Sequence, residues 1–487
     1  MLSYNNPKYS FTDKMKPDVD IYIYMTCKLN KTDIESTLNL KLPKVLFNNF
    51  TGSKDDIKTH YINDKIIIMG GLGSIDKCNY ENIRICMSNC IAQTMNIKDI
   101  SSKTLLVFIN NTNIKPIINS TILSLYTFDK YKTKTTSKTT SKTFKHIYFY
   151  SSSHVKDNRH CANRCIVIGN SINMCRNLGN EPANFLTPIS FSKFMKHRSK
   201  TNNYTVNILG IKEIKKLKMG GILGVSSGSN YNPLFVTIKY NGTSKSHKPI
   251  VLIGKGVVFD SGGINVKTGD FADMKTDMLG GACVFSIIDA LSQLKVKKNI
   301  IGLIPLVENM PSSNAMRPGD IIKTGLGKTI EVINTDAEGR LILADALEYS
   351  HKFKPSLIID MATLTGQADR ITDNKASIIL GNNNRVINKM IDIGDEINDK
   401  VINMPIWRDF VDQTKSDIAD YKNMDLSSNG GSTIYAGAFL SNFVPPKTDW
   451  VHIDLGGSYT NSHQYYNKQG CTGVGVNLVI NYIESNV

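Results

Sequence analysis

Residues 251–263 have the sequence VLIGKGVVFDSGG, in which two short apolar runs lead to an acidic residue and a pair of glycines. Val251–Ile253 and Val257–Phe259 have the length and composition of buried β-strands. Asp260 follows the second run directly, and the Ser-Gly-Gly that comes next is typical of a tight turn. The stretch therefore predicts a buried strand that ends at a carboxylate, although Asp260 would also serve as an ordinary turn residue.

Apolar strands and helix-like segments alternate on both sides of this stretch. Helical periodicity is present in 158–178, 284–294 and 341–351, and further strands are expected at Ile300–Val307, Ile330–Ile333, Leu357–Met361 and Trp450–Leu455. Such alternation favours the α/β class, with a central mixed sheet flanked by helices. Ligands of these folds bind beyond the strand ends. We expect this larger C-terminal domain to cover residues 158–487.

The first 150 residues predict a separate, small α/β domain. Strands are expected at Asp20–Cys27 and Lys65–Met69, and a helix at Ile83–Met95. The stretch at about 130–145, KYKTKTTSKTTSKTFK, holds six lysines and no acidic residue, which is typical of an exposed linker. No group of catalytic residue types is found before it, so chemistry is expected in the larger domain.

Composition limits the classes of protein that the chain can belong to. The 487 residues carry a net charge of +16, and the first 150 hold 21 Lys and Arg against 12 Asp and Glu, an excess of nine. The lysines alternate with Asn, Ile and Thr rather than with arginines or aromatic residues, which favours a solvated surface over a nucleic-acid site. No apolar run reaches the roughly 18–20 residues of a membrane span, and no secretory pattern is present, so a cytoplasmic location is expected. Nine cysteines without a CxxC pair indicate reduced thiols.

Acidic residues are concentrated beyond the predicted strand ends of the larger domain. Asp336 and Glu338, in NTDAEGR, follow one strand and precede a helix, as Asp260 follows another. With Asp277, these residues make four carboxylates. In one confined site they would repel each other unless cations neutralise them. Two divalent metals about 3.5–4 Å apart would do so and would form a hydrolytic centre. The candidate residues are Lys255, Asp260, Lys267, Asp277, Asp336 and Glu338.

Each member of this group also has a purely structural interpretation. Thr335 to Glu338 is a satisfactory capping box for the helix that follows. Lys255 and Lys267, taken alone, would be solvated lysines. The joint occurrence of glycine-flanked acids at predicted strand ends, with two lysines close to Asp260 in the sequence, favours the metal site.

Several motifs resemble the leucyl aminopeptidase family, the two-metal cytosol aminopeptidases. The octet at the start of NTDAEGRLILADAL (334–347) is similar to the signature of that family. The resemblance covers roughly residues 158–487. It is carried by CRNLGNEPANFLTP (175–188), IGKGVVFDSGGINVK (253–267), MKTDM (274–278), DMATLTGQ (360–367), DIADYKN (417–423), AGAFLSNFV (436–444) and WVHIDLGG (450–457).

The resemblance implies a centre of two divalent ions, most often zinc or manganese. Asp260 and Glu338 would bridge the two ions, Asp336 would complete the shell of one, and Lys255 with Asp277 that of the other. A lysine ligand must be neutral, and two adjacent dications would lower its pKa.

The resemblance also implies roles in catalysis and substrate binding. Lys267 would stay charged and polarise the scissile carbonyl. Arg340 would hold a bicarbonate that acts as general base. Substrate contacts would come from Asn334 and the Leu364 backbone, and Met274, Thr363 and Gly366 would line an apolar pocket for the first side chain. The Lys267–Asp277 spacing is one residue shorter than the commonest family pattern, so the rim at 270–274 is expected to differ.

The expected function is therefore a metal-dependent aminopeptidase that releases N-terminal leucine or other apolar residues from peptides with a free amino group. The resemblance implies a homohexamer. One alternative is a nucleic-acid-binding or regulatory protein on an aminopeptidase scaffold, which the net charge of +16 suggests. Another is a different two-metal hydrolase such as a phosphatase, which the absence of histidine from the cluster disfavours.

Overall fold

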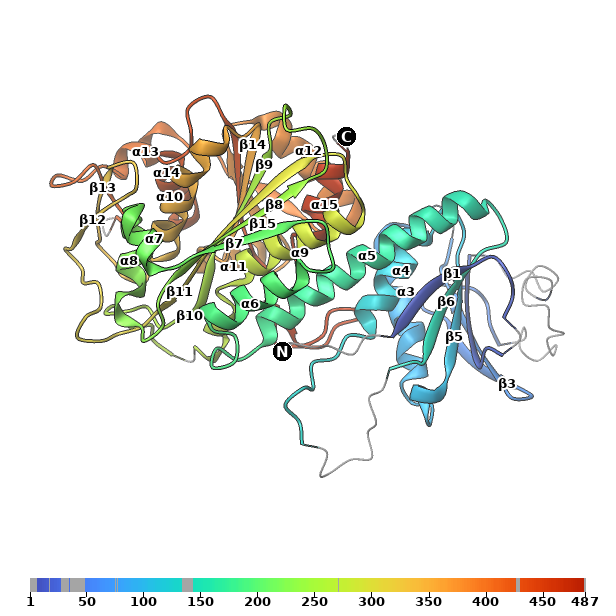
Figure 1. Ribbon diagram of the computed structural model, residues 1–487. Helices are drawn as coiled ribbons and strands as arrows, with labels where there is room; N and C mark the ends of the chain where they lie inside the picture. Colours follow the sequence, from blue (N-terminus) through green and yellow to red (C-terminus); the bar gives the residue numbers. More distant parts are fainter. Residues whose placement is uncertain are drawn as a thin grey trace. The chain divides into compact units, whose positions relative to one another are not determined.

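The computed structural model describes residues 7–16, 18–27, 35, 49–74, 76, 78–133, 143–269, 271–425 and 430–485 (Figure 1). The chain forms two compact units. The larger consists of 171–460 with 470–487, and the smaller of 3–170 with 461–469. Residues 134–142 of the lysine-rich tract lie outside the described residues.

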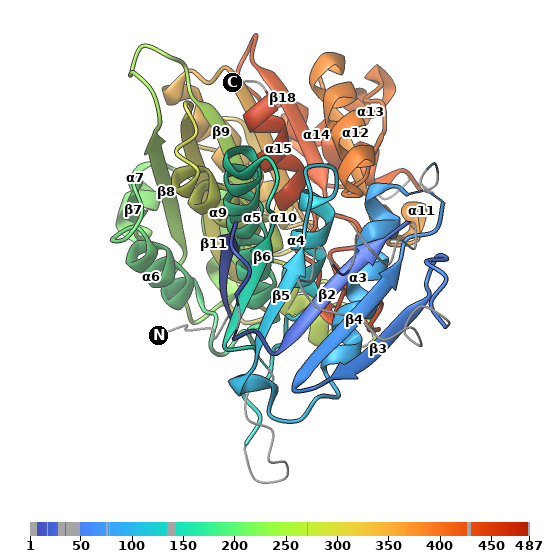
Figure 2. The ribbon, with the colours of Figure 1, turned by 90° about the vertical axis from the view of Figure 1, so that its right-hand side faces the viewer.

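The smaller unit is a mixed sheet with helices. Its strands lie side by side in the order β1-β6-β5-β2-β4-β3 (Figure 2), parallel except for the β3–β4 pair. Helices α3 and α4 pack on each other and share one apolar core with the sheet. The elements are β1 (Lys8–Thr12), β2 (Ile21–Thr26), β3 (Ile57–Ile62), β4 (Lys65–Gly71), α3 (Tyr80–Thr94), η2 (Ile100–Ser102), β5 (Thr104–Phe108), α4 (Ile114–Ser124), β6 (His146–Tyr150) and the first part of α5 (Val155–Asn180).

The larger unit is built on a mixed sheet of order β16-β15-β18-β14-β9-β11-β8-β7, with β10 paired to β11. Strands β18, β14, β9 and β11 run parallel, whereas β8, β7 and β15 introduce antiparallel pairs. The strands are β7 (Thr205–Leu209), β8 (Leu234–Asn241), β9 (Ile250–Gly254), β10 (Gly256–Asp260), β11 (Asn299–Asn309), β14 (Leu357–Ala362), β15 (Ser377–Gly381), β16 (Val401–Asn403) and β18 (Asp449–Asp454).

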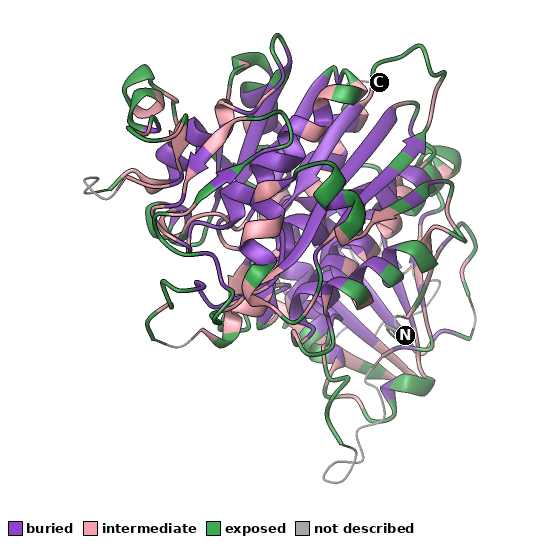
Figure 3. Ribbon diagram, turned by 60° about the vertical axis from the view of Figure 1, so that its left-hand side comes forward, coloured by how far each residue is buried: buried purple, intermediate pink, exposed green. Residues whose placement is uncertain are grey.

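Helices cover both faces of this sheet, so its central strands are buried (Figure 3). Helix α9 packs on β9, β11 and β14, and α10 packs on β9 and β11 with α8 and α14 beside it. The helices are α6 (Pro188–Arg198), α7 (Ile211–Lys216), α8 (Gly220–Val225), η3 (Ser226–Gly228), η4 (Ala272–Thr276), α9 (Leu279–Gln293), α10 (Gly339–Ser350), η5 (His351–Phe353), α11 (Gly366–Thr372), α12 (Asn384–Ile397), α13 (Arg408–Gln413), α14 (Ser432–Ser441) and α15 (Val476–Ser485). The predicted class, a small α/β domain and a larger one with a mixed sheet flanked by helices, is confirmed.

Helix α9 is the helix expected from the periodicity of 284–294, and it is buried on more than the face that carries this periodicity. Residues 279–292 are all buried, because the helix packs on the central sheet and also contacts α15. The buried residues are apolar or small except for Asp289, which is paired with Arg198 and accepts from Tyr204. Its first turn comes close to the sheet through Gly280, where a Cβ would lie 2.1 Å from the carbonyl oxygen of Met361.

The strand expected at 330–333 lies elsewhere than the sequence suggested. Strand β13 (Thr329–Glu331) pairs with β12 (Ile321–Lys323) and β17 (Tyr421–Lys422) in a small separate sheet, not in the central one. A further pair is formed by β19 (Tyr459–Thr460) and β20 (Gly470–Cys471). Short apolar runs carry no signal for the sheet that they join, since only distant partners decide it.

Among the described residues, none of the helices combines the length and apolar character that crossing a membrane requires.

Candidate metal centre

Three buried carboxylates from distant parts of the larger unit meet at the ends of β9 and β10. Asp260 is the last residue of β10, Asp277 follows η4, and Glu338 directly precedes α10. One carboxylate oxygen from each of the three lies within 4.8 Å of the others. All three are less than 8% exposed. The other four residues predicted to bind metal or take part in catalysis lie around these carboxylates: Lys255, Lys267, Asp336 and Arg340.

Lys255 lies in the middle of these carboxylates, between β9 and β10. Its Nζ lies 2.7 Å from Asp277 Oδ1 and 2.9 Å from Glu338 Oε1. It also donates to the carbonyl oxygen of Thr363 at 2.9 Å. The lysine can pass beside α10 because residue 339 is glycine. A Cβ there would lie 2.5 Å from Lys255 Cε.

Lys267 and Asp336 form the more open side of the same group. Lys267 Nζ lies 2.8 Å from Asp260 Oδ2 and 2.5 Å from Asp336 Oδ1. The side chains of Lys267 and Asp336 are 21% and 33% exposed, whereas that of Asp260 is 3% exposed. A substrate from solvent would therefore meet Lys267 and Asp336 before it reached the buried carboxylates.

Hydrogen bonds hold Asp260 in place. Its Oδ1 accepts from Asn309 Nδ2 at 2.8 Å and from the Gly262 backbone at 3.0 Å. The second bond is the turn interaction that the sequence suggested, and it leaves Asp260 Oδ2 beside Lys267. Sequence reasoning missed Asn309, although it ends β11, the strand that pairs with β10, and an amide at such a strand end was the available signal.

The capping box expected at Thr335–Glu338 is not formed. Glu338 itself occupies the N-cap position of α10, without a side-chain capping bond. The Thr335 hydroxyl group donates to the Gly262 carbonyl at 2.7 Å and lies 3.0 Å from Asn265 Oδ1. These contacts join the 334–338 segment to the turn after Asp260.

Thr363 contacts the cluster of carboxylates directly. The sequence had suggested only that it lines an apolar pocket. Its hydroxyl group donates to Asp277 Oδ1 at 2.8 Å, and its carbonyl accepts from Lys255. The next residue, Leu364, has its backbone N–H bound to Asp454 Oδ1 at 2.9 Å. A substrate contact by the Leu364 backbone would therefore use its carbonyl group.

The remaining predicted substrate residues lie at different depths. Met274 is half-buried in η4, and Gly366 is exposed at the start of α11. Asn334 is half-buried, and its Oδ1 accepts from the Asp336 backbone at 2.7 Å. The structure thus brings Asn334, Thr363 and Leu364 into direct or adjoining contact with the carboxylate segments.

Asn423 is a buried residue at the end of the DIADYKN motif, and it was not among the site residues predicted from the sequence. Its side chain accepts from the Ile333 backbone at 2.7 Å and donates to the Asn334 carbonyl at 2.7 Å. Its own carbonyl accepts from Arg340 Nη1 at 2.7 Å. Asn423 therefore holds both the segment that carries Asp336 and the guanidinium group of Arg340.

The electrostatics of the group reflect excess negative charge. Burial raises the pKa of Asp277 well above its ordinary value, and the Glu338 and Asp260 carboxylates add to this against the opposing effect of Lys255. Burial and the Asp260 carboxylate raise the pKa of Asp336 to about 6. Burial alone would lower the pKa of Lys255 and of Lys267, but the surrounding carboxylates outweigh it and raise both.

The donor set fits divalent cations. Asp277 Oδ2 is buried without a hydrogen-bond partner among the described residues. Four carboxylates face only two ammonium groups, so the group has a formal charge of −2 that bound cations would neutralise. Oxygen donors with one amine suit zinc, manganese or magnesium. Arg340 fits an oxyanion, because its buried Nε has no partner among the described residues.

Fold and site together define an α/β protein with a buried carboxylate centre suited to divalent metals. The sequence profile of the cytosol aminopeptidase family, catalytic domain, matches residues 173–480. The chain belongs to this family of metal-dependent aminopeptidases, as the sequence resemblance indicated.

Relatives of similar length support this assignment. A probable cytosol aminopeptidase of Geobacter sp. (strain M21) is 38% identical over 365 residues, which cover 74% of this chain and 73% of that protein. The probable cytosol aminopeptidase of Sulfurihydrogenibium sp. (strain YO3AOP1) is 37% identical over 437 residues, or 88% and 84% of the two chains. That of Rickettsia peacockii (strain Rustic) is 34% identical over 430 residues, or 86% and 85%.

Solved structures share the fold. The bottromycin maturation enzyme BotP superposes with a TM-score of 0.83 at 22% identity, over 96% of this chain and 99% of that one. A complex of BotP with Mn gives the same TM-score at 23% identity, over 97% and 100%. At this identity the likeness supports the fold of the chain and not its substrate.

Proposed function

We propose that the protein releases the N-terminal residue from peptides, preferentially leucine or another apolar residue, at a two-metal centre formed by Lys255, Asp260, Asp277, Asp336 and Glu338. The observation that carries this proposal is the convergence of three buried carboxylates within 4.8 Å beside two lysines. Two divalent ions, zinc or manganese, would polarise the scissile carbonyl and supply an activated water.

The residues of the chain would divide the remaining work. Lys267, on the more open side, would donate to the carbonyl oxygen as negative charge develops there. Arg340 would orient a bicarbonate through its free Nε, while Asn423 holds the other side of the guanidinium group. Bicarbonate held in this way is a candidate general base.

Recognition of a free amino group follows from the carboxylates. Asp277 Oδ2 is a buried acceptor without a protein donor among the described residues, and a terminal amine would supply one. An internal amide nitrogen carries no charge and is less suited to this position. Asn334, the Leu364 carbonyl and the pocket residues Met274, Thr363 and Gly366 would hold the rest of the substrate.

The assay that tests this proposal compares leucyl amide with N-acetyl-leucyl amide, after chelation and add-back of single metals. We expect hydrolysis of the free amine alone, abolished by chelation and restored by zinc or manganese. Equal turnover of free and blocked substrates would exclude an exopeptidase. A wild-type protein that binds metal but cleaves neither substrate would exclude this function.

Three further features are proposed. Residues 158–487 would form the catalytic domain and 1–150 an accessory domain. The chain would assemble as a homohexamer, a closed symmetry that buries surface, and would be located in the cytoplasm. A nucleic-acid partner is not favoured. Sedimentation at physiological salt tests the assembly, and a fully active monomer would contradict it.

A further inference from the structure

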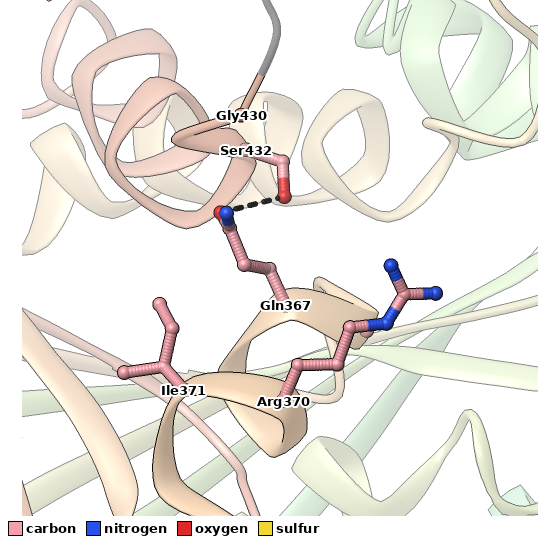
Figure 4. Close-up of a pocket in the computed structure, with 6 residues that line it drawn as sticks. Gln367, Arg370, Ile371, Gly430 and Ser432 are labelled. Carbon is pink, nitrogen blue, oxygen red and sulfur yellow. Dashed lines mark hydrogen bonds between the residues drawn. The ribbon is translucent and has the colours of Figure 1, made fainter.

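A pocket of about 500 Å³ lies beside helix α11. Arg370 and Ile371 lie on either side of Gln367, and Gly430 and Ser432 face them from the start of α14 (Figure 4). Its lining residues are Gly366, Gln367, Arg370, Ile371, Gly430 and Ser432. These residues include one cationic side chain and no acidic one, so the pocket favours an anionic group.

Hydrogen bonds fix the side of the pocket that Gln367 forms. Gln367 Oε1 accepts from Ser432 Oγ at 3.0 Å and from the Thr433 backbone at 3.1 Å. The amide therefore joins α11 to α14, and its Nε2 group remains as a hydrogen-bond donor. A Cβ added at Gly366 would meet nothing within 4 Å, so the space beside the start of α11 is open.

Arg370 is the charged group of this pocket. Its side chain is exposed, and no ion pair, hydrogen bond or ring contact joins its guanidinium group to a described residue. The neighbouring Asp369 forms no ion pair with it, and Asp369 Oδ1 accepts from the Gly457 backbone at 2.7 Å. An unpaired guanidinium group is a planar donor that matches a carboxylate.

The pocket lies close to the metal centre along the chain. Gly366, at its edge, is three residues after Thr363, which binds both Asp277 and Lys255. Three residues span at most about 11 Å, which is also the length of roughly three extended peptide residues. A peptide of three residues whose amino group lies at Asp277 is therefore long enough to reach the edge of the pocket at Gly366.

We propose that this pocket is a carboxylate subsite, in which Arg370 and the Gln367 amide recognise a carboxylate on the peptide beyond the scissile bond. This inference rests on the proposed aminopeptidase function. The carboxylate can be the terminal one of a short peptide or the side chain of an acidic residue. In either case the enzyme would prefer such peptides to neutral ones of the same length.

The test measures kcat and KM for three peptides: Leu-Gly-Gly, its C-terminal amide, and Leu-Gly-Asp-amide. Arg370→Gln removes the charge at an exposed position, and we expect it to raise KM by about three- to tenfold for peptides that carry a carboxylate, with kcat nearly unchanged. The neutral amide should be unaffected, and Arg370→Lys should restore part of the preference. The matched control is Arg385→Gln, which changes an exposed arginine of α12 outside the pocket.

The three peptides also identify the source of the carboxylate. A loss confined to Leu-Gly-Gly assigns the pocket to the peptide terminus, and a loss confined to Leu-Gly-Asp-amide assigns it to an acidic side chain. No change in any peptide, or the same change in all three, would overturn the inference. Calorimetric binding of the same peptides to wild type and Arg370→Gln gives a readout even without turnover, so failure of the aminopeptidase proposal is distinguishable from failure of the subsite.

Discussion

The Thr363 hydroxyl group donates a 2.8 Å hydrogen bond to Asp277 Oδ1, although 86 residues separate the two in the sequence. Asp277 lies after the short helix η4, and this bond fixes the carboxylate beside Lys255. Because this bond uses Oδ1, Oδ2 is left as the available acceptor. Oδ2 has no protein partner among the described residues.

We expect Thr363→Val to lower kcat by about tenfold, because a hydrogen bond to a charged group contributes about 1.5–3 kcal/mol. Thr363→Ser retains the hydroxyl group and should keep most of the activity. The concentration of metal needed for half-maximal activity should rise in the Val variant. Unchanged kcat and metal requirement in Thr363→Val would show that this bond does not position Asp277.

Asp336→Ala and Glu338→Ala should each abolish hydrolysis while largely preserving the fold. The physical reason is the loss of an anionic oxygen from a centre that needs such oxygens to hold dications. Activity, bound metal and circular dichroism are measured together, with Asp320→Asn, which changes a carboxylate paired with Arg317 outside the centre, as the control. Full activity of either variant at saturating metal would place the centre elsewhere.

Gly339→Ala tests whether the narrow passage beside α10 positions Lys255. A Cβ at residue 339 would lie 2.5 Å from Lys255 Cε and 2.8 Å from Nζ, so the lysine must shift. We expect activity to fall by at least about tenfold. The helix itself should not be destabilised, because helix propensity favours alanine over glycine by about 1 kcal/mol. Gly210→Ala is the matched control, since its nearest contact would be 3.4 Å. Equal activity of both variants would contradict this positioning role.

The buried pair of His452 and Asp360 makes stability depend on pH. His452 Nδ1 lies 2.5 Å from Asp360 Oδ1, and both side chains are fully buried. Burial alone would lower the pKa of His452, but Asp360 outweighs it and raises that pKa above the ordinary value of 6.5. The folded state therefore binds the proton more tightly than the unfolded state does.

The stabilisation from this proton is full below about pH 6.5 and is lost as the pH rises through the higher pKa of the folded state. We expect the difference in Tm between wild type and His452→Gln to be largest near pH 6 and to shrink as the pH is raised. His197→Gln, at an exposed position of α6, should show no such trend. A difference that stays constant or grows with pH would contradict the assignment.

The sequence by itself determined the α/β class and the candidates of the centre. Val257–Phe259 and Leu357–Met361 are apolar runs of strand length, and local periodicity was enough to place strands there. Asp260 at a strand end and the NTDAEGR motif then predicted where a metal centre would lie. These features depend on neighbouring residues, so they can be recognised without knowledge of the fold.

Only the tertiary structure decided which distant residues complete the centre. Asn309 binds Asp260, Thr363 binds Asp277, and Asn423 binds Arg340, across 49, 86 and 83 residues. The placement of β13 in a small separate sheet and the pocket around Arg370 were decided in the same way. A hydrogen bond between remote segments leaves no periodic pattern in either segment, because its partner is fixed by the path of the whole chain.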